Sequence, residues 1–81
     1  MRKNKQRGKV VDVKRTILQS PNEKIKTRAM YARVITGVNT KTYCVMIWNH
    51  YLDGKSGLSE HINCSTKKEM LNVFNLLSKI N

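Results

Sequence analysis

The sequence predicts an α+β protein in which a four-stranded antiparallel meander precedes one C-terminal helix, in the order β-β-β-β-α. Three observations predict this class. Apolar and polar residues alternate up to residue 64, turn-forming residues separate the alternating segments, and apolar residues recur with a helical period after residue 66. A chain of 81 residues has room for one core. We therefore expect a single domain over residues 9–81, preceded by a flexible basic arm over residues 1–8.

The first expected strand spans residues 9–18. Its alternation places Val11, Val13 and Ile17 on one face and polar residues on the other. A turn is expected at residues 20–23, because proline presets φ there and the flanking serine and asparagine bond to the local backbone.

Three further strands are expected at residues 25–38, 41–52 and 58–64. A tight two-residue loop, Asn39-Thr40, is expected to join the first two of them, since asparagine tolerates a positive φ. A five-residue loop over residues 53–57 is expected to close the second hairpin. Hairpin connections this short predict that neighbouring strands pair in chain order.

Residues 66–80 are expected to form the helix. Thr66 is the predicted N-cap, and Glu69 completes a T-x-x-E capping box. The apolar residues at helical spacing predict one buried face. They are Met70, Val73, Phe74, Leu77 and Ile80, with Leu71 and Leu76 on the flanks. The helix is therefore expected to pack on one face of the sheet.

The expected loop lengths fix a register and, with it, two sheet faces. The first face carries Ala29, Tyr31, Arg33, Ile35, Cys44, Met46, Trp48, His50, Leu52, Leu58, Glu60, Ile62 and Cys64. The second face carries Met30, Ala32, Val34, Thr36, Tyr43, Val45, Ile47, Asn49, Tyr51, Ser59, His61 and Asn63. We assign the first face to the helix, because the fourth strand turns its apolar residues toward it. The second face also has an apolar middle, so we expect a second copy of the chain to cover it in a homodimer.

Basic residues concentrate in the first part of the chain. Sixteen Lys and Arg against five Asp and Glu give a net charge of +11. Residues 1–33 hold eleven of the sixteen and only two acids. This asymmetry favours a polyanionic partner, DNA or RNA, contacted through the arm and the edge formed by the first two strands. The expected contacts are Arg2, Lys3, Lys5, Arg7, Lys9, Lys14, Arg15, Lys26, Arg28 and Arg33.

Aromatic side chains in the sheet are the second candidate feature, because a ring on an open sheet can stack on a base. Tyr43 and Tyr51 are the possible stacking residues. Trp48 and Tyr31 are expected to serve in core and cross-strand packing instead.

Several classes are not expected. No apolar run is long enough to span a bilayer, and no apolar segment follows the basic N-terminus as in a signal peptide. The two cysteines are too few for a disulfide framework, so we expect reduced thiols and a cytoplasmic protein.

Catalysis is not expected either. His50 and Glu60 are cross-strand neighbours in the expected register, which would suit a base and its orienting carboxylate, but a simple polar pair is the commoner meaning. The remaining ligand candidates, Cys44, His61 and Cys64, lack metal-binding spacing. We expect no enzyme, no metal and no cofactor.

One segment resembles a known family. The strand, the turn containing Asp53-Gly54-Lys55, the next strand and then Ser65-Thr66-Lys67-Lys68-Glu69 opening a helix, all within residues 43–77, resemble the AP2-like arm-type DNA-binding domain of phage and conjugative-transposon integrases. The resemblance implies a sheet packed on one helix, with the sheet entering the major groove. The extra first strand and the more apolar exposed face depart from that family, so no base-contacting residue is carried over.

These features predict a small, non-catalytic nucleic-acid-binding protein. Its Lys- and Asn-rich composition and small size would suit an accessory factor of a phage or mobile element. One alternative is a small inhibitor or regulator that docks on another protein or on a protein–nucleic-acid complex, for example a phage-encoded inhibitor of a host defence system, with the positive charge steering association. The other alternative is a small nuclease that uses His50 and Glu60.

Overall fold

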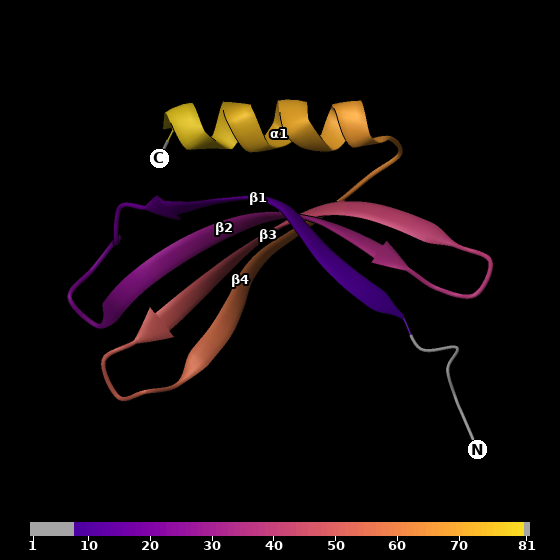
Figure 1. Ribbon diagram of the computed structural model, residues 1–81. Coiled ribbons are helices and arrows are strands. Elements are labelled where there is room, and N and C mark those ends of the chain that lie inside the picture. Colours follow the sequence, from indigo (N-terminus) through magenta and orange to yellow (C-terminus); the bar gives the residue numbers. More distant parts are fainter. Residues whose placement is uncertain (1–7, 81) are drawn as a thin grey trace, which may run out of the picture.

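The computed structural model describes residues 8–80 and confirms the predicted meander and helix (Figure 1). The elements are β1 (Lys9–Leu18), β2 (Ile25–Thr36), β3 (Lys41–Tyr51), β4 (Ser56–Cys64) and α1 (Lys67–Ile80). Neighbouring strands pair antiparallel in the order β1-β2-β3-β4. The expected arm, with Arg2, Lys3, Lys5 and Arg7, lies outside the described residues apart from Gly8.

The predicted hairpin loops were wrong in length. Thr36 pairs with Lys41, so four residues join β2 to β3, and the Gly37 N–H donates to the Thr40 carbonyl at 2.9 Å. The next hairpin closes early, with the Tyr51 N–H donating to the Lys55 carbonyl at 2.8 Å. Gly54 takes φ +90° in that turn, a left-handed conformation that glycine adopts without a Cβ clash. β4 consequently begins at Ser56, two residues before the predicted start.

The helix begins at the predicted capping box. The Thr66 hydroxyl accepts a hydrogen bond from the Glu69 N–H at 3.1 Å. The Glu69 carboxylate accepts one from the Ser65 N–H at 2.7 Å, one residue before the position that a capping box ordinarily uses. Glu69 also lies in the first helical turn, where its negative charge interacts favourably with the positive end of the helix dipole.

The helix covers the face opposite to the predicted one. One core cluster joins Met70 and Phe74 of α1 to Met30 and Ala32 of β2, with Ile47 of β3 in the same cluster. All five are at most 2% exposed. The apolar middle that was expected to bind a second copy is therefore covered by α1 itself. Figure 1 shows α1 lying across one side of the sheet and, within residues 8–80, no element on the other side.

β4 was assigned to the wrong faces because it contains a β-bulge. Glu60 pairs with Ile47 and Leu58 pairs with Trp48, so Ser59 is an extra residue between them. Beyond this bulge the alternation reverses, which places Ile62 and Cys64 on the helix side instead of the predicted side.

The shorter hairpin loop and the same bulge together remove the proposed catalytic pair. His50 pairs with Ser56, and its ring Nδ1 lies 2.8 Å from the Ser56 hydroxyl. Glu60 lies opposite Ile47, on the other face of the sheet. His50 and Glu60 are therefore not cross-strand neighbours.

A second bulge reorganises β1. Asp12 pairs with Arg33 and Lys14 with Ala32, which makes Val13 the extra residue. The predicted common face of Val11, Val13 and Ile17 is therefore wrong. Val11 lies on the helix side, and Ile17 lies on the opposite side with Asp12.

Candidate nucleic-acid interface

The sheet surface that α1 does not cover is the candidate site, and we name it the open face. Alternation along the paired strands defines its residues. They are Val10, Asp12, Arg15, Ile17, Ala29, Tyr31, Arg33, Ile35, Thr42, Cys44, Met46, Trp48, His50, Ser56, Leu58, His61 and Asn63. Ala29 and Cys44 are fully buried even here.

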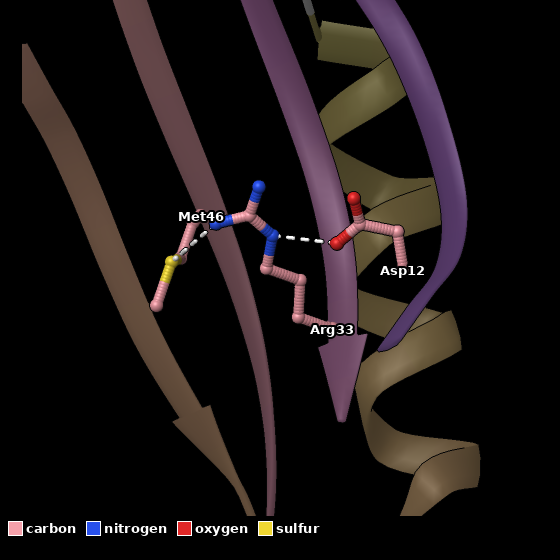
Figure 2. A network of polar contacts seen from close by, with 3 residues as sticks. All are labelled: Asp12, Arg33 and Met46. Carbon is pink, nitrogen blue, oxygen red and sulfur yellow. Dashed lines mark hydrogen bonds and ion pairs between the residues drawn. The ribbon is translucent and has the colours of Figure 1, made fainter. Parts of the chain in front are cut away.

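Arg33 lies at the centre of a cluster that crosses three strands (Figure 2). Its Nε donates to the Asp12 carboxylate of β1 at 2.6 Å, and its Nη1 donates to the Met46 sulfur of β3 at 3.5 Å. Its guanidinium carbon lies 4.3 Å from the centroid of the Tyr31 ring. The ion pair is partly exposed, with 22% of the Arg33 side chain and 42% of the Asp12 side chain accessible to solvent, so its contribution to stability is small. Its main consequence is positional, since it fixes the guanidinium beside the ring.

Arg15 approaches the same ring from β1. Its guanidinium carbon lies 5.8 Å from the Tyr31 centroid, within the range of a cation–π contact. Arg15 is exposed, and no hydrogen bond to its guanidinium is found among residues 8–80. Its N–H donors therefore face solvent and are available to an anion such as a phosphate.

Trp48 lies beside this cluster on β3, opposite Ala29 of β2 and Leu58 of β4. The residue is half-buried. Its indole Nε1 is buried without a hydrogen-bond acceptor in the part of the chain that the structure describes. Buried indole N–H groups usually find a partner, so this orphaned donor marks Trp48 as an unusual position.

The predicted basic edge divides between the two sides of the sheet. Arg15 and Arg33 reach the open face, and Lys14 and Arg28 lie on the helix side. The Lys14 ammonium donates to Asn75 of α1 at 3.1 Å and lies 5.3 Å from the Phe74 ring centroid.

Arg28 contacts a buried neighbour on the helix side. Its Nη1 donates to the buried Asn49 at 3.4 Å, and its Nε is buried without an acceptor among residues 8–80. Lys9 and Lys26 are exposed, the first at the start of β1 and the second at an irregularity near the start of β2.

The aromatic residues lie on the opposite faces from those expected. Tyr43, a predicted stacking residue, packs half-buried against the core on the helix side. Tyr51 lies on that side too, with its ring near Gly57. Tyr31 and Trp48, which were expected to pack in the core, are the two aromatic residues of the open face. The missing signal was the bulge in β4, because it decides which face receives the apolar residues of that strand.

The thiols are poor nucleophiles where they stand. Burial raises the pKa of Cys44, and the neighbouring Arg33 charge only partly opposes the rise. Burial also raises the pKa of Cys64, with smaller contributions from Glu69 and Cys44. Neutral thiols of this kind react slowly, because the thiolate is the nucleophile. Over residues 8–80 no group of three or more His, Cys, Asp or Glu is placed to hold a metal ion.

No helix in the described part of the chain is long and apolar enough to cross a membrane. In comparisons with family models, curated proteins and solved structures, none matches this chain. The resemblance to the integrase arm-binding domain stays a prediction, and the function is inferred from the residues described above.

Proposed function

We propose that this chain is a non-catalytic nucleic-acid-binding protein and that the open face is its contact surface. One observation carries the proposal: the guanidinium groups of Arg15 and Arg33 are both held over the Tyr31 ring on a face that no other described element covers. Guanidinium groups bind phosphate through several N–H donors, and aromatic rings stack on bases. The cluster offers both kinds of contact within one small area.

The charge distribution supports the same function. The net charge of +11 attracts a polyanion over long distances. Of the five acidic residues, Asp12 alone lies on the open face, and Arg33 pairs with it. Lys9, at the start of β1, and the basic residues of the N-terminal arm would add phosphate contacts without sequence preference.

Fluorescence anisotropy with labelled oligonucleotides at several salt concentrations tests the proposal. The matched variants are Arg15→Ala on the open face and Lys79→Ala in the last turn of α1, which remove the same charge from different places. If Arg15 contacts one phosphate, its loss reduces the slope of log K against log[salt] by about 0.7 to 0.9. We expect the smaller change for Lys79→Ala. Equal changes in the two variants would mean that the charge acts generically and would contradict an interface on the open face.

Truncation of residues 1–7 tests the arm separately. Four of the sixteen basic residues lie in this segment. We expect the truncated chain to bind more weakly, with a flatter salt dependence, and to retain the difference between Arg15→Ala and Lys79→Ala. Unchanged affinity after truncation would exclude the arm from the interface.

A protein partner is the second candidate, and exposed apolar residues favour it. Val10, Ile17 and Leu58 on the open face are 56%, 53% and 45% exposed. Apolar surface of this kind is typical of a protein interface when it is contiguous. Association with a protein that persists at high salt and after nuclease treatment, together with polylysine-like binding to every nucleic acid, would favour this candidate.

A further inference from the structure

Resting on the proposed function, we infer that the ligand of the open face is single-stranded nucleic acid, whose unpaired bases stack on Trp48 and on the Tyr31 ring together with the Arg33 guanidinium that lies against it. These two aromatic side chains belong to adjacent strands. Tyr31 pairs with Met46, and Trp48 pairs with Ala29, so the two aromatics are diagonal neighbours. Diagonal positions in an antiparallel pair are about 7 to 8 Å apart, which is within reach of aromatic side chains. The open face therefore holds two neighbouring stacking surfaces, the Trp48 ring and the Tyr31 ring with the Arg33 guanidinium 4.3 Å from its centroid.

The surroundings of these rings suit the flat surfaces of bases better than their edges. Ala29, Cys44, Met46 and Leu58 fill the space between the two rings and carry no strong hydrogen-bonding groups, whereas Arg15 and Arg33 lie at the Tyr31 ring. Recognition of a duplex through its groove depends on donors and acceptors placed against the base edges. In a duplex the base surfaces are already stacked on each other, so a face built from rings and apolar side chains gains little from it.

The charged groups lie where the backbone of a stacked strand would pass. Arg15 is exposed beside Tyr31, with its donors free of hydrogen bonds among the described residues. A base that stacks near Tyr31 carries its phosphate within reach of a long, flexible arginine. Arg15 and Arg33 against Asp12 leave the open face positive, as the whole chain is at +11, and this charge argues for a negative strand over an apolar protein surface.

The orphaned indole N–H of Trp48 adds a further point. Its donor is buried without an acceptor among residues 8–80, so the present orientation of the ring lacks a hydrogen bond that another orientation would allow. A nucleic-acid oxygen that reached this N–H would supply the missing bond.

The experiment uses the full chain and the intrinsic fluorescence of Trp48, which is the only tryptophan. The chain is titrated with a short oligothymidylate and, separately, with a duplex of equal length, and labelled strands give the bound fraction in parallel. We expect the single strand to quench Trp48 strongly and the duplex to quench it little at the same bound fraction. Base–aromatic stacking is worth about 1 to 3 kcal/mol per base, so Tyr31→Leu should weaken single-strand binding about 5- to 150-fold. Tyr51→Leu is the matched control on the helix side.

The outcomes separate the two proposals. Loss of affinity in Tyr31→Leu but not in Tyr51→Leu, with both variants folded by circular dichroism and with Trp48 quenched more strongly by the single strand than by the duplex, supports stacking on the open face. Equal affinities in both variants, together with equal binding of single strand and duplex, overturn the inference of stacked single strands. The proposed function still stands in that case if Arg15→Ala and Lys79→Ala differ in their salt dependence. Absence of binding to any nucleic acid overturns both. Trp48 emission that changes with protein concentration alone would show that a second copy covers the open face. This result would also overturn the inference of stacked single strands.

Discussion

Truncation of the largest buried side chain of α1 should remove much of the stability of the domain. Phe74 is 2% exposed and belongs to the core cluster with Met30, Ile47 and Met70. A change from Phe to Ala at a buried site costs about 3 to 5 kcal/mol, because transfer energy is lost and a cavity remains. A domain of 81 residues has a total stability of only about 4 to 12 kcal/mol. Phe74→Ala should therefore leave a marginally folded chain.

The assay is urea unfolding followed by far-ultraviolet circular dichroism, with Leu76→Ala as the control. Leu76 lies on the same helix but is 60% exposed, so its truncation should change stability by no more than about 0.5 kcal/mol. With an m-value of about 1 to 1.5 kcal/mol per molar urea, Phe74→Ala should lower the midpoint by at least about 2 M. Equal midpoints for the two variants would refute the packing of α1 on the side of the sheet that carries Met30 and Ile47.

Three further changes test single positions in the sheet. Asp12→Asn should cost less than about 1 kcal/mol, because the ion pair with Arg33 is partly exposed, and should tighten nucleic-acid binding in anisotropy by removing a negative charge from the open face; weaker binding would contradict this. Burial raises the pKa of the Cys44 thiol, so the stability that the neutral thiol contributes is lost as the pH rises above about 9. Between two alkaline pH values, the urea midpoint of the unchanged chain should therefore fall more steeply than that of Cys44→Ala. Equal slopes for the two proteins would contradict this. Deletion of Val13, the extra residue of a bulge, should preserve the fold in circular dichroism, and deletion of Val34 in β2 should not; equal loss of structure would disprove the assigned bulge.

The sequence alone was sufficient for the order and type of all five elements. Alternation predicted the strands, and the capping residues Thr66 and Glu69 predicted the start of the helix to within one residue. The faces of β2 and β3 were also grouped correctly, because the error in their pairing was two residues and side-chain alternation has a period of two. Local sequence patterns were therefore enough to predict the topology.

The face that the helix covers could not be predicted, because both faces of the central strands are apolar. Met30, Ala32 and Val45 on one side differ little in hydrophobicity from Ala29, Cys44 and other residues on the opposite side. The decision rested on the alternation in β4, where Ile62 and Cys64 were the deciding residues. The bulge at Ser59 reversed their side, and the alternating pattern alone carries no mark of which residue is extra.

The bulge in β1 connects the fold to the candidate site. Regular alternation from Asp12 would place Lys14 on the open face, and the extra residue Val13 places Arg15 there instead. The exchange matters because the planar guanidinium of arginine lies over an aromatic ring and still presents several donors to a phosphate, whereas lysine offers a compact point charge. Lys14 is directed to the helix side, where it bonds to Asn75. One inserted residue thus brings the second arginine to the Tyr31 ring and assembles the cluster on which the proposed function rests.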